Sequence, residues 1–403
     1  MLKSLNKHSY LYSNSMKTNP ITPLSIYVHI PFCVQKCAYC DFVSTSIHKA
    51  EHSYGIEAYF ESLNREIELY SDVLCAYTIE TIYLGGGTPS AVDGSYIESI
   101  IKRIRSLANV SETAEITVEV NPGTLDARKL EHYLTAGVNR ISMGLQTTND
   151  QLLNEIGRIH STEDFIKTYN MVRANGIHNI SLDLMFGLPG QTLVDISKAL
   201  ELVDALKPQH VSAYGLKLEE GTPLYQLANK GAVILPDEAL ERQMYHYITE
   251  GLNNIGFKQY ELSNYAQLGF ASRHNLVYWR NKPYLGLGVS SHSKLDNKRF
   301  SNHSDIKTYI QSLNAFNKPV DAVEVIDSEE DLFETIMLGL RLNEGLNLKQ
   351  ISTQYNIDFV NKYQVVIDQL IEDRLIVLSN ENIKLTALGR DLANQVFVAF
   401  MKD

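Results

Sequence analysis

The chain has 403 residues, of which 44% are hydrophobic and 21% charged, a composition typical of a folded globular protein. Its formal net charge of −11 argues against a nucleic-acid-binding protein, because phosphate recognition requires a basic face. No apolar run approaches the roughly 18 residues that a membrane-spanning helix needs.

Residues 1–22 are expected to form a disordered tail. The first 20 residues contain Lys3, Lys7 and Lys17 but no acidic residue. They lack both the apolar core of a secretory signal and the arginines of an organellar presequence, and Met16 is an alternative start of translation. We therefore expect a cytoplasmic protein, in which clustered cysteines serve metal binding or catalysis rather than disulfides.

Between residues 26 and 218, short β-rich runs alternate with helix-like stretches. The runs are, in chain order, "SIYVHI", "ETIYLGGG", "EITVEV", "NRISMGL", "NISLDLMFG" and "QHVSAYGL". Six strands that alternate with helices predict an α/β fold with a parallel sheet and right-handed crossovers. No GxGxxG follows the first strand, so a closed or partial (β/α) barrel over residues 23–250 is favoured over a dinucleotide-binding fold.

Unusual residues stand at the C-terminal ends of the predicted strands, where a barrel builds its active site. They are Cys33, the run from Gly85 to Pro89, Glu119 with Asn121, Gln146, Asp183 and the pair Ala213-Tyr214. We therefore expect all six strand ends to contribute to one site.

The remaining chain divides into two further regions. Residues 251–320 read less regularly and are expected to link the domains and close the barrel. In residues 321–403, helices near 328–343, 347–355 and 358–372 precede a hairpin-like run and a final helix, an order that resembles a winged helix. This region carries 15 acidic against 7 basic side chains, a difference of −8. Because DNA binding needs the opposite sign, a lid or protein-interaction module is favoured.

The segment "CVQKCAYC" holds three of the four cysteines of the chain: Cys33, Cys37 and Cys40. A structural zinc site needs four ligands, and Cys75, in a helical pattern, is expected to be a buried core thiol. Zinc therefore requires a nearby histidine, namely His29, His48 or His52. A [4Fe-4S] cluster has four irons, so three cysteines leave one iron open for an exogenous ligand. The cluster is favoured, and zinc is the alternative.

The C-x3-C-x2-C spacing, with the aromatic Tyr39 before the last cysteine, resembles the signature of the radical S-adenosylmethionine (SAM) superfamily. Further segments resemble its HemN/HemW group from about residue 24 onward: "YLGGGTPS", "EVNPGT", "SMGLQTTND", "DLMFGLPGQT", "SAYGLKLEEGTP", "ELSNYAQLGFASRHNLVYW" and "YLGLGVSSHS". The resemblance implies a partial (β/α)6 barrel followed by a small helical C-terminal domain.

One position separates the two members of that group. Oxygen-independent coproporphyrinogen III oxidase has a further cysteine two residues after the last cluster ligand, whereas this chain has Phe42. The "HNLVYW" stretch also resembles HemW heme chaperones. Both features favour a heme chaperone that is able to cleave SAM reductively, with the oxidase as the alternative.

The resemblance also implies site residues. Cys33, Cys37 and Cys40 would ligate the cluster. The positions that match SAM contacts are Tyr27, Tyr39, Gly86, Gly87, Thr88, Glu119, Gln146, Arg158, Asp183 and Ala213.

For heme, the resemblance points to His274 as a ligand of the iron, with the flat faces of Tyr278 and Trp279 beside it. The alternative is that this segment closes the barrel, with His274 hydrogen-bonded internally. The implied partners are heme, a heme-accepting respiratory protein, and an electron donor such as a flavodoxin or an NADH system. Contact with a membrane surface during delivery is also implied, and nucleic acid is not.

Overall fold

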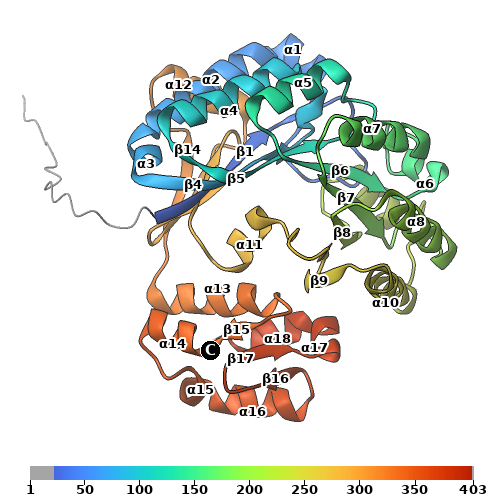
Figure 1. Ribbon diagram of the computed structural model, residues 1–403, viewed down its shortest axis with the longest axis vertical. Helices are drawn as coiled ribbons and strands as arrows, with labels where there is room; N and C mark the ends of the chain where they lie inside the picture. Colours follow the sequence, from blue (N-terminus) through green and yellow to red (C-terminus); the bar gives the residue numbers. More distant parts are fainter. Residues whose placement is uncertain (1–21, 402–403) are drawn as a thin grey trace, which may run out of the picture.

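The computed structural model describes residues 22–401, so the tail expected over residues 1–22 falls outside it except for its last residue. The largest sheet in this part of the chain has 12 strands in the order β14-β13-β12-β11-β1-β4-β5-β6-β7-β8-β10-β9. Its curved centre is wrapped by helices on the outside (Figure 1). No helix among the described residues combines the length and apolarity needed to cross a membrane.

Six neighbouring parallel strands form the centre of this sheet. They are β1 (Thr22–Ile30), β4 (Tyr77–Gly86), β5 (Asn109–Val120), β6 (Arg140–Gln146), β7 (Asn179–Phe186) and β8 (His210–Gly215). Each overlaps one of the runs identified in the sequence, and each pairs in parallel with its neighbour. The sheet does not close on itself, so the predicted partial (β/α)6 barrel is confirmed.

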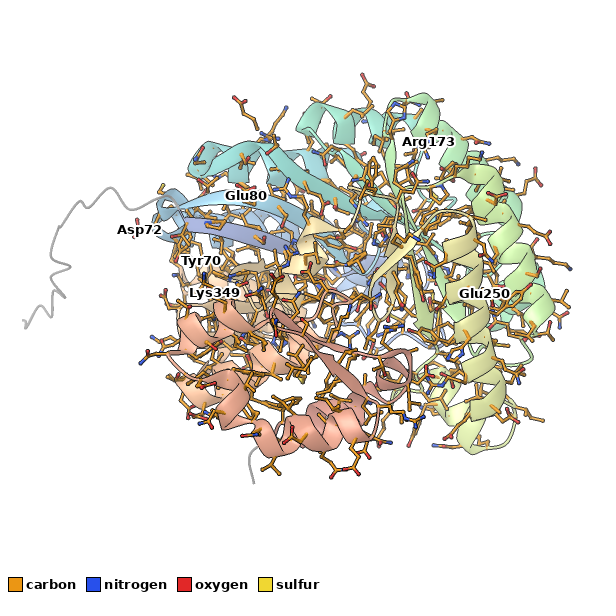
Figure 2. The ribbon with its side chains drawn as sticks, turned by 60° about the horizontal axis from the view of Figure 1, so that its bottom comes forward. Tyr70, Asp72, Glu80, Arg173, Glu250 and Lys349 are labelled. Carbon is orange, nitrogen blue, oxygen red and sulfur yellow. The ribbon has the colours of Figure 1, made fainter. Side chains whose placement is uncertain are left out.

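The outer helices bury one apolar face each. In α4 (Gly94–Leu107), Ile97, Ile100, Ile101 and Ile104 are fully buried at the spacing of one helix face, and Asp93 caps the N-terminus. Figure 2 shows the charged side chains of this layer turned outward, with Glu250 as an example. The other helices and turns before residue 260 are α1 (Ile47–Ser53), α2 (Ile56–Leu69), α3 (Ser71–Ala76), η1 (Pro89–Ala91), α5 (Ala127–Ala136), α6 (Asp150–Glu155), α7 (Thr162–Ala174), α8 (Leu193–Leu206), α9 (Pro223–Asn229) and α10 (Glu238–Asn254).

The region expected as a linker extends the main sheet on both sides. Its strands are β9 (Lys258–Glu261), β10 (Asn264–Ala266), β11 (Tyr284–Leu287), β12 (His292–Leu295) and β13 (Lys298–Asn302), followed by helix α12 (Ile306–Asn314) and strand β14 (Val320–Val325). Between β10 and β11, helix α11 (Arg273–Trp279) lies against β4, beside the C-terminal domain in Figure 1. We call α11 the barrel floor.

The C-terminal domain has its own apolar core and a three-stranded sheet in the order β15-β17-β16. The predicted helices and hairpin are present in the predicted order. The elements are α13 (Ser328–Leu340), β15 (Leu346–Asn347), α14 (Leu348–Tyr355), α15 (Phe359–Lys362), α16 (Gln364–Glu372), β16 (Ile376–Leu378), β17 (Asn382–Leu385), α17 (Ala387–Asp391) and α18 (Ala393–Ala399).

Candidate functional site

The cysteine loop is closed at its base by a small parallel sheet. Strand β2 (Phe32–Cys33) follows β1 directly and pairs with β3 (Thr45–Ser46). The tip of the loop is held by Ala38, whose N–H donates to Ile156 at 3.0 Å and whose carbonyl accepts from Leu224 at 2.8 Å. The loop therefore has a fixed course between two clamps, which positions its three thiols before any ligand binds.

The three thiols lie in an environment that disfavours free thiolates. Cys33 is buried, and Cys37 and Cys40 are half-buried. Burial raises the pKa of Cys33, and it raises the pKa of Cys40 to about 11. Thr88 donates to the Cys33 sulfur at 3.5 Å and Arg158 to the Cys37 sulfur at 3.8 Å. These contacts are too weak to keep the three thiols deprotonated. Coordination to a positively charged metal centre would stabilise the thiolates.

Two of the side chains considered for zinc, His29 and Cys75, already have other partners. Both ring nitrogens of His29 are engaged, with the hydroxyl of Tyr27 at 3.0 Å and the carbonyl of Val43 at 2.8 Å. Cys75 is exposed, not buried as expected, and donates to Leu107. No three His, Cys, Asp or Glu side chains in the described part of the chain are grouped to hold a single ion. A cluster needs no such convergence, because its ligands bind different irons.

The glycine run Gly85–Gly87 at the end of β4 lets other groups of the chain come close to its backbone. A Cβ atom on Gly87 would lie 2.8 Å from the carbonyl oxygen of Ile30, and one on Gly85 would lie 2.8 Å from the carboxylate of Glu119. Gly86 has a φ of +106°, which side chains rarely adopt. The run therefore leaves backbone rather than side chains on the cavity wall, with the Thr88 hydroxyl beside Cys33.

Two carboxyl groups face the cavity from neighbouring parts of the sheet. Glu119 on β5 accepts from the Tyr83 hydroxyl at 2.7 Å and from the Gly86 N–H at 3.2 Å. Asp183 on β7 accepts from Ser142 at 3.4 Å. Burial raises the pKa of Glu119 to about 7 and that of Asp183 to about 6. Additional hydrogen-bond donors would stabilise the ionised form of both carboxyl groups, and a ligand rich in hydroxyl or ammonium groups supplies such donors.

The side chains of Gln146 and Arg158, twelve residues apart in the sequence, both lie against Gly144, where a Cβ atom would be 2.7 Å and 2.8 Å from them. Gln146 ends β6 with a φ of +66°, where the register to β7 also shifts. Arg158 donates to Asn121 at 2.5 Å and to the Gly144 carbonyl at 3.0 Å, while its buried Nε has no hydrogen-bond partner among the described residues. Such backbone strain and an unpaired donor are typical of ligand sites.

These side chains surround one cavity of about 420 Å³. Its walls include the following predicted residues: Cys33, Cys37, Tyr39, Cys40, Gly86, Gly87, Thr88, Glu119, Gln146, Arg158 and Asp183. Two residues predicted for the site do not reach it. Tyr27 lies behind the wall, stacked on Tyr83 with ring centroids 6.3 Å apart, and Ala213 is buried in β8.

Sequence reasoning missed several residues of the cavity wall. On β6, every second residue faces the cavity: Arg140, Ser142, Gly144 and Gln146. Strand alternation was the available signal, because Gln146 fixes which residues of "RISMGLQ" point inward. The polar interior of the barrel therefore extends well below the strand ends.

The segment expected to bind heme adopts the alternative arrangement, with His274 hydrogen-bonded internally. Its Nδ1 lies 2.6 Å from the Thr81 hydroxyl and its Nε2 lies 2.9 Å from the Tyr278 hydroxyl. The ring also stacks on Tyr83, and burial lowers its pKa to about 3. Trp279 instead faces the C-terminal domain, with the Arg341 guanidinium 4.3 Å from its ring centroid. The three residues do not form one common surface.

Comparison with known proteins agrees with this geometry. Residues 27–203 match the family model of the radical SAM superfamily, and residues 326–392 match that of the HemN C-terminal domain. The heme chaperone HemW of Bacillus subtilis is 36% identical over 94% of this chain and 99% of its own length. The HemW of Lactococcus lactis is 33% identical over 94% and 98%. The chain belongs to the HemW family.

A solved structure supports the fold. The coproporphyrinogen III oxidase HemN of Escherichia coli, described as a radical SAM enzyme, superimposes with a TM-score of 0.82 at 23% sequence identity. The alignment covers 95% of this chain and 91% of HemN. The HemW-family chain therefore shares both the barrel and the C-terminal domain arrangement with HemN.

Membership of the radical SAM superfamily implies a [4Fe-4S] cluster and SAM. When bound together, these groups supply one-electron reductive cleavage of SAM. The cavity of this HemW-family chain fits both groups, because it combines three thiols, a glycine wall and the unpaired Arg158 Nε. Phe42, 61% exposed at the cavity rim, occupies the position where the oxidase resemblance requires a further cysteine.

Proposed function

We propose that the protein is a heme chaperone, which binds heme together with a SAM-coordinated [4Fe-4S] cluster and delivers the heme to an acceptor protein. The observation that carries this proposal is the similarity over 94% of the chain to relatives named heme chaperone HemW. Phe42 supports it against the oxidase alternative, because the cysteine loop offers three thiols and no fourth.

The roles of the chain's own residues follow from their positions. Cys33, Cys37 and Cys40 hold the cluster, and the two clamps of the loop keep their sulfurs in place. The backbone of the glycine run and the carboxyl of Glu119 receive the ammonium end of SAM. Arg158 binds its carboxylate, and Asp183 accepts from its ribose hydroxyls.

The heme is proposed to bind at the inner end of the cavity, against the barrel floor. Asn275 of α11 already lines the cavity, one residue from His274. His274 can bind iron only after its Nε2 gives up the Tyr278 hydroxyl, since both ring nitrogens are engaged. The proposed ligation therefore requires a local rearrangement of α11.

One anaerobically reconstituted sample tests the chaperone against the oxidase. Hemin is titrated into the sample and the Soret band recorded, and coproporphyrinogen III is incubated with SAM and a reductant in parallel. We expect stoichiometric hemin binding and no decarboxylated product. Product formation at turnover rates would establish the oxidase instead.

Iron ligation by His274 is tested with a pair of variants. His274→Ala should change the position and weaken the intensity of the Soret band. Tyr278→Phe keeps the imidazole but removes its Nε2 partner, so it should strengthen hemin binding. An unchanged Soret band in both variants would show that His274 only closes the barrel, as it does in the structure.

The setting of this activity is part of the same proposal. We infer a cytoplasmic protein with a respiratory heme protein as acceptor, and a flavodoxin or an NADH-dependent system as electron donor. Delivery would bring the protein to a membrane surface. The clustering of three cysteines in one short loop supports an intracellular protein, and the acidic C-terminal domain supports docking to other proteins rather than to nucleic acid.

A further inference from the structure

Arg140 is a buried cation at the inner end of the cavity. It is the first residue of β6, and only 2% of its surface is exposed. Its side chain lines the cavity together with Ser142, Gly144 and Gln146 of the same strand. Strand alternation therefore aims the guanidinium into the barrel rather than into the surrounding apolar core.

The guanidinium of Arg140 lacks a partner. Its Nε is buried without a hydrogen bond, and no hydrogen bond or ion pair joins the guanidinium to another described residue. Its charge reaches Glu119 and Asp183 through space, but their carboxylates take their hydrogen bonds from other groups. Buried guanidinium groups are normally paired, so this one is prepared for an anion that comes from outside the chain.

Arg140 lies far from the end of the cavity that holds the cysteine loop. Arg140 and Gln146 begin and end β6, so their Cα atoms are about 20 Å apart along the strand. Of the groups that fit SAM, Gln146 and Arg158 lie toward the Gln146 end, whereas Glu119 and Asp183 lie level with Ser142 and Gly144 along the strand. Ser142 and Ser212 line the walls level with Glu119 and Asp183, and the cavity lining also includes Asn275 of α11.

We propose that Arg140 anchors a carboxylate of the bound heme at the inner end of the cavity. This inference rests on the proposed heme-binding function and names the group that orients the ligand. The planar guanidinium offers two parallel N–H donors, which match a carboxylate. The rest of the heme then extends from this anchor into the cavity.

Two probes separate the anchor from the rest of the heme site: hemin, and hemin dimethyl ester, in which both carboxylates are blocked. Reconstituted wild-type protein should bind hemin about tenfold more tightly than the diester, as expected for a charge-assisted bidentate pair. Arg140→Met should weaken the binding of hemin but not of the diester, which reduces this preference to less than about twofold. Arg140→Lys keeps the charge without the fork and should retain an intermediate preference.

A matched control removes a guanidinium outside the cavity. Arg173 on α7 (Figure 2) donates to the carbonyls of His178 and Lys207, so Arg173→Met should leave the hemin preference unchanged. SAM affinity is measured on the same samples and should not change in Arg140→Met. A fall in SAM affinity with an unchanged hemin preference would assign Arg140 to the SAM carboxylate and overturn the proposal.

Failures of the two proposals are distinguishable. If wild type binds both probes equally, or if Arg140→Met keeps the wild-type preference, heme binding stands and the anchor is wrong. If wild type binds neither probe, the heme function itself falls. The wild-type comparison and Arg140→Lys decide the question even if Arg140→Met does not fold.

Discussion

Glu66 is a carboxyl group buried without a cation in hydrogen-bond contact. It lies on α2 with no exposed surface, and accepts from the Tyr309 hydroxyl at 2.6 Å, the Gly288 N–H at 2.7 Å and the Asn302 amide. Lys318 acts on it only through space. Burial outweighs these donors and raises the pKa of Glu66 from 4.5 to about 7. This residue ties an outer helix to the extension of the sheet.

Glu66 should make the stability of the protein fall as the pH rises. Because its folded-state pKa lies above the unfolded value, its contribution is complete below pH 4.5 and lost as the pH approaches 7. Between pH 5 and pH 8, the free energy of unfolding of wild type should drop by on the order of 3 kcal/mol more than that of Glu66→Gln. Urea unfolding at both pH values measures this, with exposed Glu250→Gln as a control that follows wild type. An equal change in the free energy of unfolding between the two pH values for wild type and Glu66→Gln would contradict the prediction.

The sequence revealed some site residues and concealed others for a physical reason. The three cysteines and the glycine run are contiguous segments whose chemistry depends on local spacing. Arg140 differs, because its significance depends on a missing partner, which only the assembled barrel shows. Likewise, Glu66 resembles any helix-surface glutamate until Asn302, 236 residues away, packs over it.

At the scale of elements, α11 is held in place by contacts from the strands above it. Ser272 caps its N-terminus, and the Glu115 carboxylate of β5 accepts from the N–H groups of Arg273 at 3.2 Å and His274 at 3.0 Å. A buried carboxylate at a helix N-terminus satisfies orphan donors and interacts favourably with the positive end of the helix dipole. The position of the floor therefore depends on one acidic side chain.

Removing the Glu115 carboxylate should increase local opening of α11 without affecting other helices. Glu115→Ala leaves the N–H groups of Arg273 and of the buried His274 without their acceptor and should lower the free energy of unfolding by about 2 kcal/mol. Hydrogen exchange of residues 273–279 should become faster. Ser161→Ala is the matched control, since it removes a cap from α7 and should leave exchange in 273–279 unchanged. If exchange in these residues is also unchanged in Glu115→Ala, other contacts fix α11.

Strands and helices could be predicted from periodicity, but the orientation of α11 could not. The six parallel strands each show a short run of β-forming residues, separated from the next by a helix-like stretch, which is the pattern of a parallel α/β sheet. The direction of His274, in contrast, is decided by Thr81 and Glu115, which are 193 and 159 residues away. The sequence left two arrangements open here because neither partner is recognisable from local pattern.

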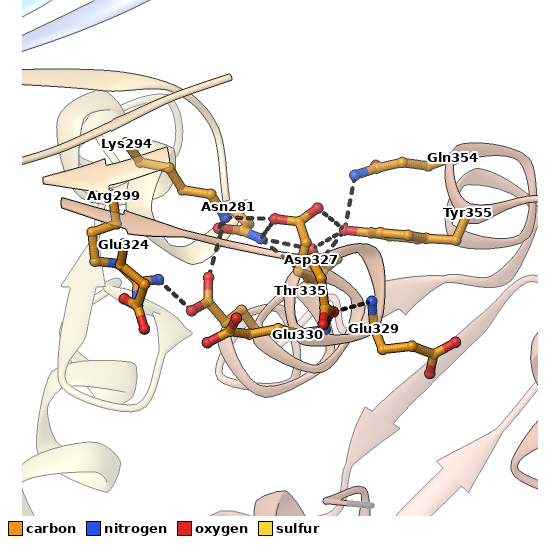
Figure 3. Close-up of polar contacts among 12 residues, drawn as sticks. Asn281, Lys294, Arg299, Glu324, Asp327, Glu329, Glu330, Thr335, Gln354 and Tyr355 are labelled. Atoms are coloured by element: carbon orange, nitrogen blue, oxygen red, sulfur yellow. Dashed lines mark hydrogen bonds and ion pairs between the residues drawn. The ribbon is translucent and has the colours of Figure 1, made fainter. Parts of the chain in front are cut away.

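At the scale of the whole molecule, an interdomain cluster of charged and polar side chains joins the barrel to the C-terminal domain (Figure 3). Lys294 on β12 is buried and donates to Asp331 at 2.6 Å and Glu334 at 3.1 Å on α13. Arg299 on β13 also pairs with Glu334, and the Tyr355 hydroxyl donates to Asp331 at 2.6 Å. The attachment of the two domains is therefore partly ionic.

Lys294→Met should weaken this attachment. It leaves Asp331, whose side chain is 30% exposed, without its cation and leaves Glu334 with Arg299 alone, which should cost about 1–2 kcal/mol and speed proteolysis of the connection between β14 and α13. Adding Asp331→Leu should restore part of the loss, because it removes one unpaired charge. Lys167→Ala, at an exposed ion pair, should leave unfolding and cleavage unchanged. Wild-type proteolysis in Lys294→Met would show that apolar contacts alone hold the domains together.

The incomplete barrel has a mechanical consequence. In a closed barrel, strand number and stagger fix the diameter, and widening it breaks hydrogen bonds between strands. This sheet is instead open, with β9 as one edge strand and β14 as the other. The barrel interior can therefore widen by bending of the sheet, without breaking hydrogen bonds between neighbouring strands. The helix α11 and the C-terminal domain limit this widening. A flat, rigid macrocycle could therefore enter through the side of the barrel and leave by the same route.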